Sequence, residues 1–266
     1  MDQKTLAKQM EIIHDAKRPN VDDLVQEIFT DFMELHGDRL YGDDHAMCCG
    51  IARLNKTPVT VIGQRKGHTT QDNIDANFGM AHPEGYRKAL RLAKQAEKFH
   101  RPVICFVDTA GAFCGVGAEE RGQGEAIARN LYEFMQLRTP VISVITGEGG
   151  SGGALGIAVA NEVFMMQNAI YSVISPRGCA SILWKDASRE LDAAQALQIT
   201  AEDLLRFGMI EGIIKEGKTQ LSYYRNIKAA LTASLKRLEG LSEEELLKQR
   251  YEKFRKVGVF MDNTPE

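Results

Sequence analysis

Three short apolar runs begin alike along the chain, and each predicts a buried strand entered by a proline. They are residues 58–63 (PVTVIG), 102–107 (PVICFV) and 140–145 (PVISVI). Continuous β-branched runs of this length are typical of strands buried on both faces. Each run leads into glycine-bearing turns and then into a helical pattern, and residues 170–174 predict a fourth strand. This alternation favours α/β layers over a sandwich or a helical bundle.

Helical periodicity marks four further stretches. Residues 21–35 place six apolar side chains on one face: Val21, Leu24, Val25, Ile28, Phe29 and Phe32. A helix that begins at Pro83 is expected to bury Tyr86, Leu90 and Ala93, with Phe99 as a further candidate. A helix over about 119–137 is expected to bury Ile127, Leu131, Phe134 and Met135. Ser242-Glu243-Glu244-Glu245 predicts a capping box and a solvated packing helix that carries Leu246, Leu247, Tyr251 and Phe254.

Composition narrows the class of protein. The chain has 266 residues, 44% hydrophobic and 26% charged, with a formal net charge of −3. These values indicate a soluble globular protein and give no electrostatic reason to expect nucleic-acid or membrane binding. Neither a signal peptide nor an apolar run long enough to span a bilayer is evident. Five cysteines without a Cys-x-x-Cys pair indicate reduced thiols and a cytoplasmic protein, with Cys48 and Cys49 as packing residues. No linker divides the chain, so we expect one domain over 1–266 with its core at about 18–258.

The segment 146–155 (TGEGGSGGAL) is the strongest functional signal. It follows the strand at 140–145 and predicts strand, tight turn and helix in succession. Glycine lets backbone amides approach a ligand closely, and the first amides of a helix lack partners at the positive end of the helix dipole. Five glycines in seven residues exceed what a turn needs. We therefore interpret this segment as a backbone site for negative charge.

Several nucleotide and hydrolase patterns also occur, but their context argues against them. Residues 212–219 (GIIKEGKT) fit the Walker A pattern, yet a helical pattern precedes them and Ile213-Ile214 predicts a short strand. Gly147-x-Gly149-x-x-Gly152 fits the dinucleotide fingerprint, but the required acidic residue is missing from 171–176. Gly149-Gly150-Ser151-Gly152-Gly153 fits the nucleophile elbow, but all six histidines precede Ser151, which excludes the α/β-hydrolase order.

A second glycine turn follows the strand at 102–107, and with it the motifs resemble one family closely. The stretches are 108–123 (DTAGAFCGVGAEERGQ), 147–155, 171–184, 77–80 (NFGM) and 83–90. Together they resemble the α subunit of bacterial acetyl-CoA carboxylase carboxyltransferase from about Arg18 to Gly258. The resemblance implies an α/β, crotonase-like fold of repeated β-β-α units with peripheral N- and C-terminal helices.

The resemblance also implies a function. Such a chain works with a β subunit in an α2β2 enzyme that transfers the carboxyl group of carboxybiotin to acetyl-CoA, giving malonyl-CoA for fatty-acid synthesis. Biotin arrives on a separate biotin carboxyl carrier protein, ATP is used only by a separate biotin carboxylase, and no metal is expected here. The implied oxyanion donors are the amides of Gly152 and Gly153. Residues expected to shape the biotin site are Gly111, Gly115, Gly149, Gly150 and Ser151.

The chain departs from the usual family pattern at three places. Ala110 stands where proline is common, Phe113-Cys114 where Tyr-Pro is common, and Arg177 where glutamate is common. Two alternatives are open beside the implied function, and these departures bear on the second. One is a stand-alone crotonase-type hydratase or isomerase, for which Glu119, Glu120 or Glu148 would be the acid–base group. The other is a non-catalytic assembly paralogue.

Overall fold

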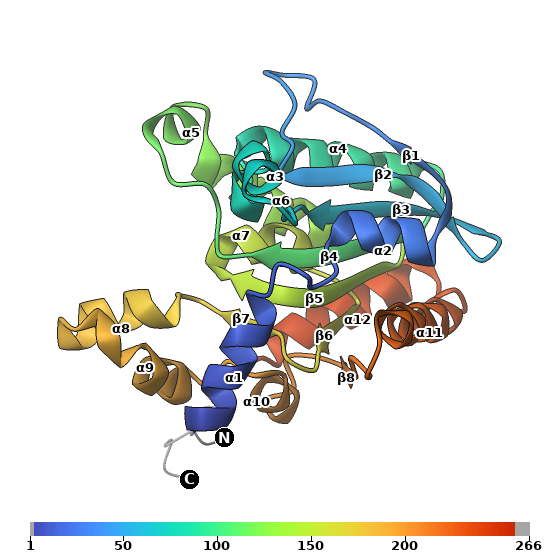
Figure 1. The fold of residues 1–266 in the computed structure, drawn as a ribbon. Coiled ribbons are helices and arrows are strands. Elements are labelled where there is room, and N and C mark those ends of the chain that lie inside the picture. The colour runs from blue at the N-terminus through green and yellow to red at the C-terminus, as the bar shows by residue number, and fades with distance from the viewer. Residues whose placement is uncertain (1–2, 259–266) are drawn as a thin grey trace, which may run out of the picture.

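One mixed sheet organises the molecule in the computed structural model, which describes residues 3–258 (Figure 1). Its strand order is β1-β2-β3-β4-β5-β6-β8, and β7 pairs with β5 beside this path. The strands are β1 (Thr30–Glu34), β2 (Met47–Leu54), β3 (Thr57–Gln64), β4 (Val103–Thr109), β5 (Val141–Gly150), β6 (Glu162–Met166), β7 (Ile170–Ser172) and β8 (Gly212–Ile214). The first three strands are antiparallel, and the pairs from β3 onward are parallel. The predicted α/β class is confirmed.

Helices cover both faces of this sheet. On one face lie α4 (Pro83–Lys98) and α7 (Ser151–Ala158), with α6 (Gln123–Met135) outside them; on the other lie α2 (Val21–Ile28) and α11 (Gln220–Leu238). Successive residues of β3 mark the two faces, as strand geometry requires. A Cβ at Gly63 would touch Val21 of α2, whereas the next side chain, Gln64, bonds to α7.

The remaining helices lie at the periphery. They are α1 (Gln3–Ile13), α3 (Thr70–Asp75), α5 (Val116–Glu120), α8 (Pro176–Trp184), α9 (Glu190–Leu197), α10 (Ala201–Arg206) and α12 (Glu243–Arg255), with the 3₁₀ turns η1 (Asn77–Gly79) and η2 (Ala187–Arg189). In Figure 1, α5 projects from the sheet above α8 and α9, on the side where β5 meets α7. This side of the molecule carries the glycine segments.

Most of the predicted elements are confirmed. Strands occur at all three proline-led runs, and Pro83 opens α4. The Ser242 capping box is present, with the Ser242 amide donating to the Glu245 carboxylate at 2.7 Å. Cys48 and Cys49 are fully buried in β2, which agrees with their interpretation as packing residues.

Other predictions are wrong in extent. The helix over 21–35 ends at Ile28, where Phe29 turns to extended backbone and β1 pairs with the edge of β2. The helix over 119–137 is broken at Gly122, whose φ of 84° separates α5 from α6. Phe99 is 57% exposed beyond the end of α4, and the strand over 170–174 stops at Ser172.

Candidate functional site

The glycine segment is tighter than the sequence suggests, because β5 and α7 join without a loop. β5 continues through Gly150, and α7 begins at Ser151. Gly149 pairs with both Thr109 of β4 and Tyr171 of β7, so Gly147, Gly149 and Gly150 belong to a strand, whereas Gly152 and Gly153 belong to α7. The direction of the chain changes at Ser151, whose φ of 50° is left-handed. The tight turn predicted over the glycine cluster is therefore reduced to the change of direction at Ser151, whereas the order of strand before helix is confirmed.

Two glycines of this segment lie directly against the chain that follows β4. A Cβ at Gly150 would overlap the Ala110 carbonyl, and one at Gly153 would overlap the Ala112 amide and lie 2.9 Å from Gly111 Cα. Gly152 differs, because its Cβ would lie 3.6 Å from the nearest atom, Ile127 Cγ2. Gly150 and Gly153 thus permit a main-chain approach that no other residue allows.

The first turn of α7 can stabilise negative charge. The initial amides of a helix have no intrahelical acceptor, and the helix dipole is positive there. Gly152 is half-buried, while Gly153 is buried. A small cavity of about 170 Å³ adjoins Gly152, with mostly apolar walls that include Leu155, Tyr171 and Met209. Amide donors beside apolar walls suit a mostly apolar ligand that carries one polar edge.

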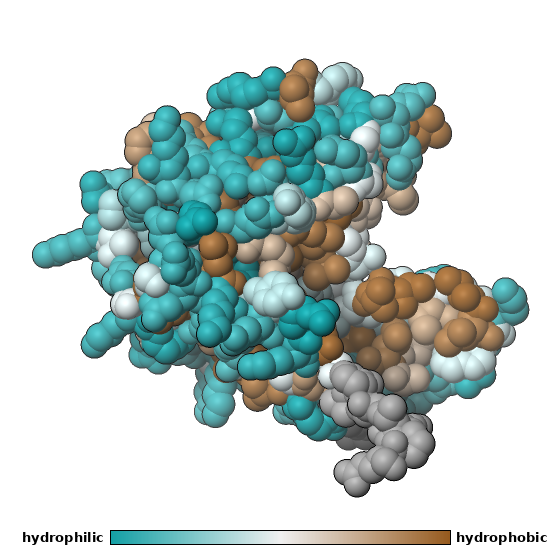
Figure 2. Space-filling model, turned by 180° about the vertical axis from the view of Figure 1, so that it is seen from behind, coloured by the Kyte–Doolittle hydropathy of each residue, from teal (hydrophilic) through white to brown (hydrophobic). Residues whose placement is uncertain are grey.

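The surface around this cavity is hollowed and apolar. Seen from behind, a notch separates the body of the molecule from the lobe that carries α8, and hydrophobic residues gather on both sides of it (Figure 2). Exposed apolar side chains of the lobe are Val173, Ile182 and Leu183, and Val116 of α5 is also exposed.

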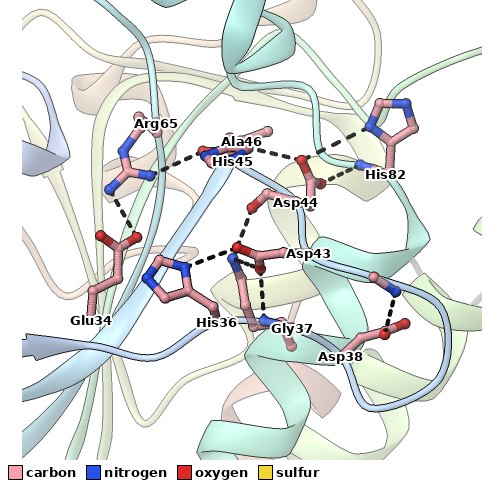
Figure 3. A network of polar contacts seen from close by, with 12 residues as sticks. Glu34, His36, Gly37, Asp38, Asp43, Asp44, His45, Ala46, Arg65 and His82 are labelled. Atoms are coloured by element: carbon pink, nitrogen blue, oxygen red, sulfur yellow. Dashed lines mark hydrogen bonds and ion pairs between the residues drawn. The ribbon is translucent and has the colours of Figure 1, made fainter.

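The segment 110–113 is fastened from two neighbouring elements. The Phe113 amide donates to the Ala81 carbonyl at 3.1 Å, and Gln123 Nε2 donates to the carbonyls of both residues. The Phe113 ring stacks on His82 with centroids 4.1 Å apart. His82 is itself fixed because its amide donates to Asp44 at 2.7 Å, in the network of Figure 3. Hydrogen bonds and ring stacking from two other elements therefore fix this half of the site.

A charged cluster lies at the ends of β3, β4 and β5. Lys66 Nζ lies 2.9 Å from Asp108 and 2.7 Å from Glu148, and His14 lies 3.1 Å from Glu148. Burial alone would raise the pKa of Glu148, but the bonds and charges of His14 and Lys66 hold it at about 2. The bond to Glu148 raises the pKa of His14. Glu148 is therefore a fully ionised, paired carboxylate, which makes it a poor general acid.

The predicted site residues fall into two groups. Gly111, Gly152 and Gly153 come together where 110–112 meets α7, next to Gly149, Gly150 and Ser151. Gly115 lies apart from them, because it caps α5 and its nearest neighbour is the Phe113 ring.

The three departures from the family pattern also have defined places. The Ala110 carbonyl faces Gly150, Cys114 is the exposed cysteine, and Arg177 is an exposed residue in the first turn of α8.

Sequence reasoning missed the polar side chains that hold α7, which are Gln64, Tyr86 and Asn130. All three donate to α7 carbonyls. Gln64 ends an apolar strand and Asn130 lies on the apolar face of α6. A polar residue in such a position is the only signal that the sequence offers.

The competing patterns can also be compared with the structure. In residues 212–219 a helix, α10, precedes the segment and Gly212–Ile214 forms strand β8, as predicted. Over residues 3–258 the structure describes no hydrogen bond between Ser151 and a histidine, and no group of three or more His, Cys, Asp or Glu that could hold a metal. Within the same range, none of the helices has the length and apolar character needed to cross a bilayer.

Relatives share both the sequence and the fold of this chain. Residues 2–258 match the family described as acetyl co-enzyme A carboxylase carboxyltransferase-like. A Clostridium perfringens protein named acetyl-coenzyme A carboxylase carboxyl transferase subunit alpha is 57% identical over 253 residues, or 93% of each chain.

Solved structures with much lower identity share the fold. Transcarboxylase 12S gives a TM-score of 0.72 at 18% identity, over 90% of this chain and 45% of that one. A Pseudomonas malonate decarboxylase hetero-tetramer gives 0.64 at 17% identity, over 79% of this chain and 86% of that one. These neighbours confirm the expected crotonase-like fold. By sequence, this chain belongs to the acetyl co-enzyme A carboxylase carboxyltransferase-like family.

Proposed function

We propose that this chain is the α subunit of an acetyl-CoA carboxylase carboxyltransferase. In this role it helps to transfer the carboxyl group of carboxybiotin, held on a biotin carboxyl carrier protein, to acetyl-CoA. The product is malonyl-CoA, the first committed intermediate of fatty-acid synthesis. Family membership supports this proposal, and the observation that carries it is the first turn of α7 packed against residues 110–112.

The proposed catalytic groups are the backbone amides of Gly152 and Gly153. Bound biotin would supply a ureido oxygen on which negative charge develops as the carboxyl group leaves. The two amides would donate hydrogen bonds to that oxygen, and the positive end of α7 would favour the charge. Loss of one such donor costs on the order of 3 kcal/mol in other enzymes. Gly111, Gly149, Gly150 and Ser151 would set the shape around these amides.

The proposed partner is a β subunit in an α2β2 enzyme. The notch beside α7 supports an active site shared between two chains, because apolar side chains of α8 remain exposed around it. Exposed apolar surface of this kind marks protein interfaces. ATP would be used by a separate biotin carboxylase, and the assembly would work in the cytoplasm.

The ionisation of Glu148 favours carboxyl transfer over the hydratase alternative. A stand-alone hydratase needs a carboxyl group that can exchange a proton near neutral pH. Glu148 is held ionised, whereas Glu119 and Glu120 are exposed on α5. Carboxyl transfer to acetyl-CoA makes no such demand on this chain, because the ureido group can take the proton of the acetyl methyl.

The test is to purify this chain together with the β subunit from the same cell. The complex should form malonyl-CoA from acetyl-CoA and carboxybiotin, while either subunit alone should not. If the intact complex forms none, the proposal is wrong. Hydration of an enoyl-CoA by this chain alone would instead favour the crotonase-type hydratase.

A further inference from the structure

Three buried side chains from three different elements hold α7 by its backbone carbonyls. Gln64 Nε2 of β3 donates to the Gly153 carbonyl at 2.7 Å, and the Tyr86 hydroxyl of α4 donates to the same oxygen at 3.2 Å. Asn130 Nδ2 of α6 donates to the Gly156 carbonyl at 3.0 Å. Each of the three side chains is at most 1% exposed. The position of α7 is therefore set by directional bonds as well as by packing.

Gln64 is the central member of this set because it joins both halves of the site. Its Nε2 donates to Gly153, while its Oε1 accepts from the Asp108 amide at 3.1 Å. Asp108 lies three residues before the segment 111–112, whose backbone lies against Gly153. One amide side chain thus spans from the end of β4 to the first turn of α7, and controls the separation of the two segments.

The side chain must be an amide to make both bonds. Glutamine offers a donor and a strong acceptor on one rigid planar group, whereas glutamate at neutral pH offers only acceptors and methionine offers no donor and only a weak acceptor. Gln64 is buried, so its two backbone partners cannot turn to water instead. A buried backbone group without a partner lowers the stability of the fold. Nothing in the strand requires glutamine here, since the neighbouring β3 positions are apolar.

We propose that Gln64 is the positioning residue for the oxyanion donors, with Tyr86 as its auxiliary. By holding the Gly153 carbonyl, Gln64 fixes the Gly152 and Gly153 amides relative to residues 110–112. It touches no reacting atom and acts through the backbone. This inference rests on the proposed carboxyl transfer. It means that two side chains outside the anion site, Gln64 and Tyr86, hold the amide donors in place.

The test is Gln64→Met in the complex with the β subunit, since methionine keeps the length of the side chain without its polar group. Misplacement of a reacting geometry by about 1 Å can cost on the order of 100-fold in rate. We expect kcat to fall at least about tenfold, with KM for carboxybiotin and acetyl-CoA unchanged within about twofold.

Gln9→Met is the matched control. Gln9 is also buried, and its Nε2 donates to the Gln167 carbonyl at 3.3 Å, far along the chain from α7. This variant should leave kcat unchanged; its melting temperature is measured alongside, because the substitution removes one hydrogen bond and also a buried Oε1 that has no partner. If Gln64→Met keeps kcat within about threefold of the unchanged complex, or if Gln9→Met loses as much, the positioning role is refuted.

Tyr86→Phe keeps the test decisive should Gln64→Met fail to fold. The ring would still pack against Gly156 while its hydroxyl donor is lost. We expect kcat to fall about three- to tenfold at constant KM, because a single neutral hydrogen bond contributes about 1 kcal/mol. An unchanged kcat would overturn the inference. If the unsubstituted complex transfers no carboxyl group at all, the proposed function itself fails, which is a separate outcome.

Discussion

Two glycine-bearing segments of this chain fit ligand-binding patterns letter for letter, and their surroundings differ sharply. Residues 148–150 are part of β5 and lie between β4 and β7, and the chain then enters α7 at Ser151 without a loop. Residues 212–219 begin as the edge strand β8 and pass through Glu216, whose carboxylate binds Arg18 and Asn168. The first segment offers helix amides beside a cavity. The second also borders a cavity, of about 360 Å³, but the wall of that cavity carries the Glu216 carboxylate, which is paired with Arg18.

The two segments differ in how closely another part of the main chain approaches their glycines. A Cβ at Gly153 would overlap the backbone of residues 111–112, whereas one at Gly212 would lie 3.4 Å from the Phe164 ring, an ordinary contact. Glycine is therefore required at 153 and replaceable at 212. The second segment does need glycine at 217, but there the reasons are a φ of 78° and the Ser222 side chain, not an approaching main chain. A matched pattern gives only the spacing of the glycines; whether glycine is required at a position depends on the main chain that lies against it, here residues 111–112.

The largest expected effect is that of Gly153→Ala. Its methyl group has to displace residues 111–112, so we expect a stability loss of about 3 kcal/mol. Turnover of the complex should fall about 100-fold, because the displacement widens the site. Chemical denaturation and malonyl-CoA formation measure the two effects.

Gly152→Ala is the matched control within the same turn. Its methyl group would point toward Ile127 with 3.6 Å of clearance. Stability should stay the same or rise by up to about 1 kcal/mol, since alanine favours the helix. Equal losses in the two variants would show that close approach is not what distinguishes these glycines.

The sequence predicts the parts of this architecture that depend on local pattern. Buried parallel strands such as residues 102–107 are continuous apolar runs, and a proline or a capping box marks a helix start at Pro83 or Ser242. The glycine segment stands out for the same reason. These signals are contained within a few neighbouring residues.

Features that depend on distant pairing could not be predicted. Phe29 and Phe32 fit a helical face, yet β1 forms because an open edge of β2 is available. β5 continues through Gly150 because β4 and β7 pair with it there. Gln64 bonds to a residue 89 positions away, so no local pattern identifies its role.

The second prediction concerns Glu148, the carboxylate of the first segment. Glu148→Gln leaves Lys66, which is 21% exposed, with Asp108 as its remaining carboxylate, and removes the partner of His14. We expect the free energy of unfolding to fall by about 2 kcal/mol near pH 6, as when other hydrogen bonds to charged groups are lost. Urea denaturation of both proteins across pH measures this difference.

The pH dependence follows from the two shifted pKa values. The pKa of Glu148 is lowered from 4.5 to about 2, so its contribution is present above pH 4.5 and is lost as pH falls toward 2. The pKa of His14 is raised above 6.5, so its contribution is present below 6.5 and is lost as pH rises through the raised value. The difference in unfolding free energy between the unsubstituted protein and Glu148→Gln should therefore be largest between about pH 4.5 and pH 6.5. Glu120→Gln, on the exposed surface of α5, is the control and should not change the free energy of unfolding. If the loss caused by Glu148→Gln were the same at every pH, the pairing of Glu148 with His14 and Lys66 would be contradicted.

A smaller effect is expected at α8, which follows the strand β7 that pairs with the first segment. Ser175 caps this helix, and Arg177 places a positive charge in its first turn. Because the start of a helix favours negative charge, Arg177→Glu should stabilise α8 by about 0.3–1 kcal/mol. Amide exchange in α8 should slow about two- to fivefold. Lys185→Glu, at the other end of the helix, should have the opposite effect, and faster exchange in Arg177→Glu would exclude the dipole explanation.

The smallest expected effect is that of Gly212→Ala in the second segment. Its methyl group would touch the Phe164 ring at 3.4 Å, and Gly212 has no left-handed backbone to lose. Stability should change by less than about 0.5 kcal/mol, and turnover should not change. The same denaturation and malonyl-CoA assays used for Gly153→Ala make the comparison direct. A large loss here would mean that glycine is required wherever the patterns match, whereas a neutral result leaves main-chain approach as the property that separates the two segments.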